Sequence, residues 1–366
     1  MVRAPGLDPA ARFGVTALAE RLAARVRAEG PIPLADFMAA ALADPEGGYY
    51  MTRDPFGAAG DFTTAPEITQ AFGELLGLWC AEVWRGLGAP TPMMLVELGP
   101  GRGALMADAL RAIGKMAPEF RAALTPHLIE ISPVLRAAQA SRLEGQGAVW
   151  LDDLAQLPPG PAIFLANEFF DALPIDQAIR RDAGWRNRRV GLDAKDRFVF
   201  VDAEVVMVDR EAEPGAILER CLAGESIAAS LGRRAAQGNS AALIIDYGEE
   251  GALGDSLQAV RGHRAQDALA DPGSADLTAH VDFAALARVT RGVGAAVFGP
   301  IPQGALLRAL GLVERTEQLM RNARPDVARS LRAGMIRLID PAAMGTLFKA
   351  LAILPPGHPP PPGFPA

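Results

Sequence analysis

An acidic residue and three glycines lie at alternate positions in one short stretch of the chain, in the form Glu-x-Gly-x-Gly-x-Gly. Glu97 is the acid, and Gly99, Gly101 and Gly103 are the glycines. Because glycine has no Cβ, the main chain can turn sharply here and a nucleoside ligand can lie against it. Dinucleotide sites have the different spacing Gly-x-Gly-x-x-Gly. The tighter spacing favours S-adenosylmethionine, whose cationic amino-acid end would face Glu97; a glycine-rich turn without any ligand is the alternative.

Acidic residues also follow the next two apolar segments, where a parallel sheet would present its ligand-binding edge. Glu130 ends the segment His-Leu-Ile-Glu, and a carboxylate at that place can accept hydrogen bonds from both ribose hydroxyls. Its alternative role is that of an exposed acid in front of a helix. Asp153, with Asp152 in reserve, follows the third segment and is expected to accept a hydrogen bond from the adenine amino group. Either aspartate is explained equally well as the cap of a helical turn.

The fourth apolar segment ends in Asn-Glu-Phe-Phe-Asp-Ala-Leu-Pro, residues 167–174. Asn167, Glu168 and Asp171 place an amide and two carboxylates around two aromatic rings, at the strand end where a methyl acceptor would meet the donor. Carboxylates at this place can hold a cationic acceptor such as a guanidinium and orient its nitrogen lone pair. We therefore predict that these residues are catalytic. One of the two phenylalanines is better explained as a core residue.

Two residues in front of a predicted helix are further candidates for cofactor binding. Thr64 and Glu67 have capping-box spacing with Pro66 in the first turn, so a long helix is expected to begin here. Asp61 precedes that helix and, together with Thr64, is expected to reach over the cofactor; a simple turn is the other explanation. The histidines are too few and too far from acidic residues in sequence to form a metal site, so no bound metal is predicted.

Short apolar segments alternate with helical patterns through the middle of the chain, which is typical of a parallel sheet with helices on both faces. The predicted strands are residues 94–98, 126–130, 148–151, 162–166 and 241–247. The predicted helices between them are residues 104–113, residues 133–143 and a long helix within residues 215–237. Antiparallel strands are expected at residues 177–180, 185–190 and 197–201, inserted near the substrate side. The fold class is therefore α/β, with a Rossmann-like sheet and an N-terminal helical segment.

The expected domain organisation follows from the same pattern. Residues 1–17 form a tail, and residues 18–90 form a helical segment that packs on the core. Residues 91–250 form the donor-binding core, with the insertion at about 175–214. Residues 251–354 complete the fold. Residues 355–366 are rich in proline and are expected to be disordered or polyproline-like.

Composition excludes several classes of protein. The 366 residues are 50% hydrophobic and 22% charged, with a formal net charge of −7, so a large core is expected and a nucleic-acid partner is not. No apolar run reaches the roughly 18 residues of a membrane helix, and the N-terminus lacks the apolar core of a secretory signal. Two isolated cysteines indicate a reducing compartment rather than a disulfide framework. The basic cluster at residues 180–189 is most simply a solvated hairpin; meeting an acidic protein surface is its alternative.

Five blocks of sequence resemble the MidA-like class I methyltransferases, from about residue 18 to about residue 354. The glycine block alone is shared by many methyltransferases, whereas Gly-Asp-Phe-x-Thr-x-Pro-Glu and Asn-Glu-Phe-Phe-Asp are far more particular. The blocks are Gly-Gly-Tyr-Tyr at 47–50; Gly-Asp-Phe-Thr-Thr-Ala-Pro-Glu at 60–67 with Phe-Gly-Glu-Leu at 72–75; Val-Glu-Leu-Gly-Pro-Gly-Arg-Gly at 96–103; the segment 167–174; and Ala-Asp-Leu-Thr-Ala-His-Val-Asp-Phe at 275–283.

The resemblance implies a seven-strand Rossmann-like methyltransferase fold with S-adenosylmethionine as donor, held by Glu97, Gly99, Gly101 and Gly103. It also implies symmetric dimethylation of an arginine on the large catalytic-core subunit of respiratory complex I, in support of assembly. Compared with the family's mitochondrial member, a long transit segment before residue 18 is missing. This predicts a bacterial cytoplasmic protein, or a mitochondrial matrix protein if the source is eukaryotic.

The sequence leaves the acceptor open in three ways. A bacterial relative could modify a different protein. A non-catalytic complex I assembly factor could retain the S-adenosylmethionine-binding fold. A methyltransferase of this fold could also act on a small molecule. The oligomeric state is not predicted.

Overall fold

The structure, a computed structural model, describes residues 16–55, 63–251 and 253–365. The chain divides into two units, each made of segments that are distant in sequence. The first unit comprises Met1–Phe62, Asp171–Gly224 and Gly251–Asp282. The second unit comprises Thr63–Phe170, Glu225–Glu250 and Phe283–Ala366. The glycine-rich turn belongs to the second unit, and the predicted insertion at 175–214 belongs to the first.

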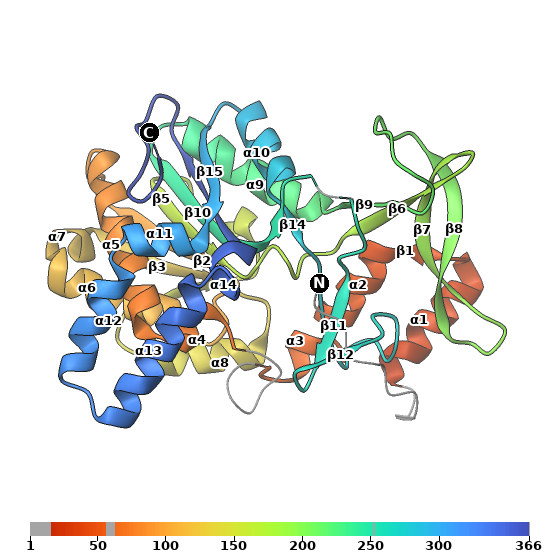
Figure 1. Ribbon diagram of the computed structural model, residues 1–366, viewed down its shortest axis with the longest axis horizontal. Helices are drawn as coiled ribbons and strands as arrows, with labels where there is room; N and C mark the ends of the chain where they lie inside the picture. The colour runs from red at the N-terminus through yellow and green to blue at the C-terminus, as the bar shows by residue number, and fades with distance from the viewer. Residues whose placement is uncertain (1–15, 56–62, 252, 366) are drawn as a thin grey trace. The chain divides into compact units, whose positions relative to one another are not determined.

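The second unit is built around a mostly parallel sheet with the strand order β15-β16-β10-β5-β2-β3-β4 (Figure 1). Strands β4, β3, β2, β5 and β10 pair with one another in parallel, and β16 is antiparallel to both β10 and β15. The strands are β2 (Met93–Leu98), β3 (Leu124–Ile129), β4 (Val149–Leu151), β5 (Ala162–Asn167), β10 (Ser240–Glu249), β15 (Ala296–Pro302) and β16 (Phe348–Leu354). Numbered along the chain, their order is 3-2-1-4-5-7-6. The predicted α/β class is confirmed.

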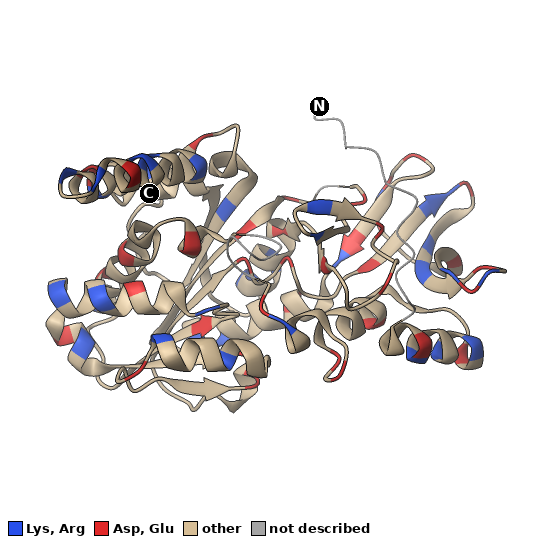
Figure 2. Ribbon diagram, turned by 90° about the horizontal axis from the view of Figure 1, so that it is seen from below, with Lys and Arg blue, Asp and Glu red and all other residues tan. Residues whose placement is uncertain are grey.

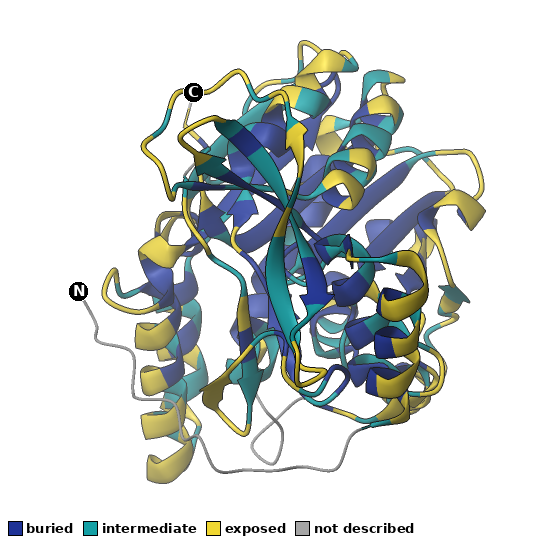
Figure 3. Cartoon of the chain, turned by 90° about the vertical axis from the view of Figure 1, so that its right-hand side faces the viewer, coloured by how far each residue is buried: buried dark blue, intermediate teal, exposed yellow. Residues whose placement is uncertain are grey.

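The sheet is covered on both faces. All six residues of β2 are buried, and Leu95 and Val96, which point to opposite faces, are each 0% exposed. Figure 3 shows strands of the parallel sheet as buried and the outer faces of the helices as exposed. The helices of this unit are α4 (Ala65–Ile68), α5 (Gln70–Gly86), α6 (Ala104–Met116), α7 (Pro118–Ala123), α8 (Pro133–Arg142), α9 (Leu222–Ala236, from Glu225 on), α10 (Phe283–Gly292), α11 (Gln303–Ala309), α12 (Leu312–Arg321), α13 (Pro325–Ile339) and α14 (Met344–Leu347).

The helices that follow the strands lie where the sequence predicts them, but the long helix expected from Thr64 is divided in two. Helix α4 is one turn long, and the chain is extended at Thr69, with φ −157°. The side chain of Thr69 then accepts a hydrogen bond from the N–H of Ala71 and caps α5. The prediction of one continuous helix is therefore wrong, because Thr69 interrupts the helical conformation and its side chain caps a new helix five positions after Thr64.

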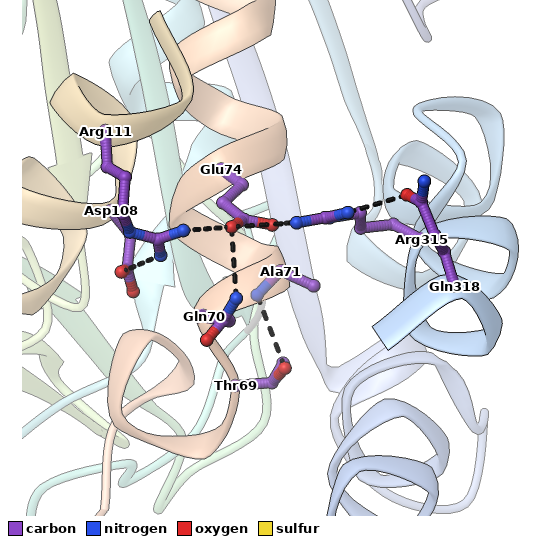
Figure 4. A network of polar contacts seen from close by, with 8 residues as sticks. All are labelled: Thr69, Gln70, Ala71, Glu74, Asp108, Arg111, Arg315 and Gln318. Atoms are coloured by element: carbon purple, nitrogen blue, oxygen red, sulfur yellow. Dashed lines mark hydrogen bonds and ion pairs between the residues drawn. The ribbon is translucent and has the colours of Figure 1, made fainter. Parts of the chain in front are cut away.

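Helices α5 and α6 cross closely because two glycines of α5 face α6. A Cβ on Gly73 would lie 2.8 Å from Cβ of Asp108, and one on Gly77 would lie 2.7 Å from Cα of Ala109. Glu74, between these glycines, is 4% exposed and accepts hydrogen bonds from Arg111 of α6 at 2.5 Å and Arg315 of α12 at 2.6 Å (Figure 4). Burial alone would raise the pKa of Glu74, but the two guanidinium groups outweigh it and hold the pKa below its ordinary value.

The first unit contains helices and two small sheets. Its helices are α1 (Ala17–Glu29), α2 (Leu34–Ala43) and α3 (Tyr49–Thr52). One sheet has the order β1-β7-β6-β9, with β8 paired to β7, and the other has the order β12-β11-β13. The strands are β1 (Ile32–Pro33), β6 (Asp176–Arg181), β7 (Gly184–Leu192), β8 (Phe198–Val206), β9 (Ile217–Arg220), β11 (Gln258–Arg261), β12 (Arg264–Gln266) and β13 (Asp276–Thr278). The three antiparallel strands predicted at residues 177–201 are confirmed as β6, β7 and β8.

The arginines of the hairpin β6–β7 are compensated by neighbouring acids. Arg181 pairs with Asp202 at 2.6 Å, and Arg189 pairs with Glu204 at 2.7 Å. Arg188 pairs with an aspartate at 2.7 Å and lies over the ring of Phe200 at 3.6 Å. Figure 2 shows basic and acidic residues interspersed along the ribbon. These contacts favour the interpretation of a solvated hairpin over that of a basic docking surface.

The proline-rich segment at the C-terminal end is packed against the second unit. The indole N–H of Trp79 donates a hydrogen bond to the carbonyl of Pro362 at 3.1 Å, and Phe364 is 8% exposed. A Cβ on Gly363 would lie 2.6 Å from Cδ1 of Leu306. The expectation of disorder is therefore wrong for the described residues, because a buried aromatic ring and a tryptophan contact fix the chain.

The described residues contain neither a candidate membrane helix nor a candidate metal-binding cluster. Within residues 16–55, 63–251 and 253–365, no helix combines the length and apolarity needed to cross a bilayer. In the same ranges, no group of three or more His, Cys, Asp or Glu residues is arranged to hold a metal ion.

Candidate active site

The glycine-rich turn leaves the end of β2 in a conformation that favours glycine. Gly99, Gly101 and Gly103 have φ angles of 61°, 52° and 75°. Other residues adopt such angles with strain, because their Cβ approaches the carbonyl oxygen. At Gly99 there is also no space, since a Cβ would lie 2.7 Å from Cδ2 of Phe169. Helix α6 begins directly after Gly103, so the turn ends at a helix N-terminus.

Glu97 is the buried acid at the end of β2. Its side chain is 3% exposed, and its Oε2 has no hydrogen-bond partner among the described residues. The main-chain N–H of Met106 donates to the carboxyl group. Burial is the main cause that raises the pKa of Glu97 to about 8; the N–H of Met106 opposes this rise and the neighbouring charge of Glu130 adds to it. A buried acid in this state would be stabilised as a carboxylate by a cation placed beside it.

Glu130, after the end of β3, is equally buried but is held by hydrogen bonds. It is 7% exposed. Its Oε1 accepts from the N–H of Ser132 at 2.8 Å, and its Oε2 accepts from the amide of Gln139 at 3.0 Å. Burial raises the pKa of Glu130, although these hydrogen bonds oppose the rise. The alternative of an exposed acid is therefore excluded, and the side chain is fixed in one orientation.

These residues fit S-adenosylmethionine. The unpartnered Oε2 of Glu97 would hold the ammonium of the methionine end, and Glu130 would accept from the ribose hydroxyls. A carboxylate has about four acceptor positions, so the partners of Glu130 leave room for a further donor. When bound, the cofactor supplies a methyl group already activated on a sulfonium. The residues of the chain would bind the cofactor, orient it toward the methyl acceptor and exclude water from the site.

The two aspartates after β4 have structural partners on the surface. Asp153 caps the short helix at Leu154–Gln156 and accepts from the N–H of Ala155 at 2.6 Å. Asp152 pairs with Arg136 at 2.7 Å, and both aspartates are exposed. The capping expected as the alternative is thus present for Asp153. Adenine recognition by Asp153 or Asp152 stays a prediction.

Glu168 lies just after β5 in a conformation that is rare for a residue with a side chain. Its φ angle is 51°, a left-handed value that costs energy unless the surroundings enforce it. Its Oε1 accepts from the N–H of Ala65 at 2.8 Å and from the amide of Asn167 at 3.1 Å. The Oδ1 of Asn167 is buried without a hydrogen-bond partner among the described residues. The strand end therefore carries two polar side chains, one of which also binds the first N–H of α4.

Asp246, on the neighbouring strand β10, holds this turn. It is 0% exposed and lies directly after Ile245, the last residue of β10 that pairs with β5. Its Oδ2 accepts from the N–H groups of Phe169 and Phe170 at 3.1 and 2.9 Å, and its Oδ1 accepts from the N–H of Tyr247. The N–H of Glu168 is bound by the carbonyl of Ile245. The only signal in the sequence is an acid within an apolar strand, and its place beside the end of β5 follows from the strand order and register.

Asp171 belongs to the first unit. It is 7% exposed, and its carbonyl accepts from the N–H of Ala279 at 2.9 Å. The hydroxyl of Tyr50 donates to Oδ1 of Asp276 at 2.8 Å. Burial raises the pKa of Tyr50 well above its ordinary value, and the charges of Asp276 and Asp171 add to the rise. Asp171 thus lies near a second buried acid, and its catalytic role stays a prediction.

Of the two residues predicted to reach over the cofactor, Asp61 lies outside the described residues. Thr64 stands at the N-terminus of α4, but its side chain makes no capping hydrogen bond. The predicted capping box is therefore not formed. Cofactor binding by either residue stays a prediction.

Comparison with known proteins shows the family of the chain. A family model described as "Putative S-adenosyl-L-methionine-dependent methyltransferase" matches residues 75–301. The chain belongs to this family. The glycine-rich turn, Glu97, Glu130 and Glu168 all lie within the matched range.

Relatives of this methyltransferase extend over nearly the whole chain. The "Protein arginine methyltransferase NDUFAF7 homolog, mitochondrial" of Drosophila melanogaster is 37% identical over 386 residues, which cover 96% of this chain and 88% of that protein. The human "Protein arginine methyltransferase NDUFAF7, mitochondrial" is 35% identical over 373 residues, covering 93% and 84%. A crystal structure from Burkholderia thailandensis, bound to S-adenosyl-homocysteine, has a TM-score of 0.82 and 27% identity and covers 95% of this chain and 94% of that chain.

The predicted cofactor and reaction class are confirmed. The protein is a methyltransferase that uses S-adenosylmethionine. The prediction rested on glycine spacing and one acid, and the structure adds the unpartnered oxygen of Glu97 that such a donor would satisfy.

Proposed function

We propose that this methyltransferase modifies arginine side chains of a protein. The observation that carries the proposal is 37% identity, over 96% of the chain, with a relative named a protein arginine methyltransferase. An arginine guanidinium stays charged in proteins and presents several N–H donors in a plane. A carboxylate beside the donor can hold that plane and turn one nitrogen toward the methyl group.

Glu168 is the residue we assign to this task. Its main chain is fixed by Asp246 and the carbonyl of Ile245, and its side chain is oriented by Ala65 and Asn167. After methyl transfer the guanidinium nitrogen must lose a proton, and a positioned carboxylate can accept it. Asn167 and Asp171, from the same segment, are proposed as its partners on the strength of their sequence positions.

We further propose that the substrate is the large catalytic-core subunit of respiratory complex I, and that the product is a symmetrically dimethylated arginine. The sequence resemblance supports this substrate. The proposed compartment is the bacterial cytoplasm, or the mitochondrial matrix for a eukaryotic source; the relatives from Drosophila and human are labelled mitochondrial.

The proposal is tested with purified protein, methyl-labelled S-adenosylmethionine and the recombinant core subunit. We expect label in that subunit, located on arginine by tandem mass spectrometry, which also gives the number and symmetry of methyl groups. Glu168→Gln should lower the rate by about 100-fold or more, the usual contribution of a positioned acid–base group. Glu144→Gln, an exposed acid, is the matched control and should be neutral. Label only in a low-molecular-mass product would overturn the proposal.

The cofactor half of the proposal has its own control. Gly101→Val places a β-branched side chain at a φ angle of 52° in the turn, where it is strained and would occupy the ligand's place. Calorimetry should detect no binding of S-adenosyl-homocysteine. Wild-type affinity in this variant would show that the donor binds elsewhere.

A cellular experiment separates catalysis from binding. Cells depleted of the protein are supplied with the wild type or with Glu168→Gln, and complex I assembly is measured on native gels. We expect only the wild type to restore assembly. Full restoration by the variant, with methylation absent, would show that binding rather than catalysis is the essential role.

A further inference from the structure

Gln139, in the middle of α8, is a buried amide that connects three separate parts of the second unit. It is 0% exposed. Its Nε2 donates to the carbonyl of Gly101 at 2.6 Å and to Oε2 of Glu130 at 3.0 Å. Its Oε1 accepts from the indole N–H of Trp150 at 2.8 Å. These three partners follow or belong to β2, β3 and β4, the adjacent strands whose ends form the donor site.

The chemistry of the partners fixes the orientation of the amide. An indole N–H can only donate, while a carbonyl and a carboxylate can only accept. The oxygen of Gln139 must therefore face Trp150, and its NH₂ group must face Gly101 and Glu130. Glutamate at this position would place a second carboxylate against Glu130, and methionine would leave all three partners without their hydrogen bond.

Gln139 also packs against the last glycine of the turn. A Cβ on Gly103 would lie 3.4 Å from Cγ of Gln139. One side chain thus holds the main chain of the turn by a hydrogen bond at Gly101 and lies beside it at Gly103. The same side chain holds the carboxylate assigned to the ribose.

We propose that Gln139 is a positioning residue for the donor, which locks the glycine-rich turn and the Glu130 carboxylate into one preformed arrangement. Without it, the turn and the acid would each have to be ordered when the cofactor binds, and that ordering weakens affinity. The inference deepens the donor half of the proposed function and rests on that half alone, so it does not depend on the acceptor.

The test compares two buried glutamines of the same unit. Gln303 is also 0% exposed, and its Nε2 donates to the carbonyl of Leu338 at 3.0 Å. Gln139→Met and Gln303→Met each replace a buried amide by an apolar side chain of similar length. We expect the calorimetric Kd for S-adenosyl-homocysteine to rise about tenfold or more in Gln139→Met, as expected when charged and neutral hydrogen bonds are lost together. Gln303→Met should stay within about twofold of the wild type on the same scale.

Thermal unfolding of the ligand-free variants separates positioning from stability. Both substitutions are expected to lower Tm, because each leaves buried polar groups unsatisfied. A fall in Tm in both, with an unchanged Kd in Gln139→Met, would overturn the proposal and leave Gln139 a structural residue. Steady-state kinetics give a second readout: KM for S-adenosylmethionine should rise more than kcat falls.

If Gln139→Met does not fold, Trp150→Phe tests the same proposal by removing a hydrogen-bond partner of Gln139. This change removes the donor to Oε1 of Gln139 and keeps an aromatic ring, so we expect a rise in Kd of about threefold, which is at the lower end of the net contribution of one hydrogen bond. No change in Kd would contradict the proposal. Absence of binding in the wild type would overturn the donor site as a whole, whereas binding without arginine methylation would leave this inference intact and reject the proposed acceptor.

Discussion

Glu74 and Glu97 are two buried glutamates of the same unit with opposite surroundings. They are 4% and 3% exposed. Glu74, on α5, is bound by Arg111 and Arg315 and has a pKa below its ordinary value. Glu97, at the end of β2, has an oxygen without a partner among the described residues and a pKa of about 8. The carboxylate of Glu74 has its partners within the fold. One carboxylate oxygen of Glu97 lacks a partner among the described residues, at the place where a cationic ligand is expected.

The difference shows how burial can serve structure in one place and binding in another. A buried ion pair with two arginines joins α5, α6 and α12 and makes the removal of one partner costly. A buried acid with an unsatisfied oxygen destabilises the ligand-free protein, and the cation that satisfies it recovers that free energy on binding. The two acids should therefore respond oppositely to substitution and to pH.

The largest effect is expected at Glu74. Glu74→Ala removes the acid shared by Arg111, which keeps Asp108 as a partner, and Arg315, which keeps Gln318. Because the two arginine side chains are 37% and 31% exposed, the free energy of unfolding should fall by about 2–3 kcal/mol, as for lost hydrogen bonds to charged groups. Denaturant unfolding monitors this loss. For the fraction that remains folded, we expect a Kd for S-adenosyl-homocysteine within about threefold of the wild type. A free energy of unfolding near that of the wild type would contradict the structural role assigned to Glu74.

At Glu97 the main effect should be on binding. Glu97→Gln replaces a charged partner of the ammonium by a neutral one, which costs about 1.5–3 kcal/mol, or about 10–100-fold in Kd. Calorimetry measures the change. The ligand-free variant should be at least as stable as the wild type, because it no longer buries an ionisable group. A large loss of stability with unchanged affinity would assign Glu97 to the core instead of the donor site.

The pH dependence of stability should have opposite signs for the two acids. Glu97 binds its proton more tightly in the folded state, so its contribution is present at low pH and is lost as pH rises from about 5 through about 8. Glu74 binds its proton less tightly when folded, so its contribution is lost as pH falls below about 4.5. Each slope should approach about 1.4 kcal/mol per pH unit at most. The free energy of unfolding is measured at several pH values for the wild type, Glu97→Gln and Glu74→Gln. The difference between the wild type and each variant gives the slope that is due to each acid. Slopes of the same sign would contradict the comparison.

Asp153 provides the smallest effect because it is exposed and already caps a helical turn. Asp153→Asn keeps a side chain that can cap but replaces the carboxylate proposed to accept from adenine. We expect a rise of about threefold in Kd for S-adenosyl-homocysteine with little change in Tm. Unchanged affinity for S-adenosyl-homocysteine would confine Asp153 to its structural role.

The parts of the fold that the sequence predicted are those specified by local pattern. The apolar strands β2, β3, β4 and β5 and the helices between them follow from alternation, and the glycine-rich turn follows from its spacing. The break at Thr69 was missed because Thr64 already provided a start signal. Strand β16 was missed because Phe-Lys-Ala-Leu-Ala-Ile-Leu has no local feature that separates a strand from a buried helix.

The sequence pointed to candidate site residues only at or next to a strand end, as for Glu97, Glu130 and Glu168, and their roles stay predictions. Gln139 and Asp246 act through contacts with segments 38 and 77 positions away, so no spacing rule points to them. In sequence, Gln139 looks like one more polar residue on a helix, and only the packing of α8 shows that its amide is buried.

Proton release on ligand binding tests the central claim, that the carboxyl group of Glu97 holds the cationic end of the donor. With a pKa of about 8, about nine-tenths of Glu97 carries a proton at pH 7 in the ligand-free protein. Calorimetric titration with S-adenosyl-homocysteine in two buffers of different ionisation enthalpy counts the protons exchanged. The account predicts release of nearly one proton in the wild type and almost none in Glu97→Gln. Equal proton exchange in the two proteins would contradict it.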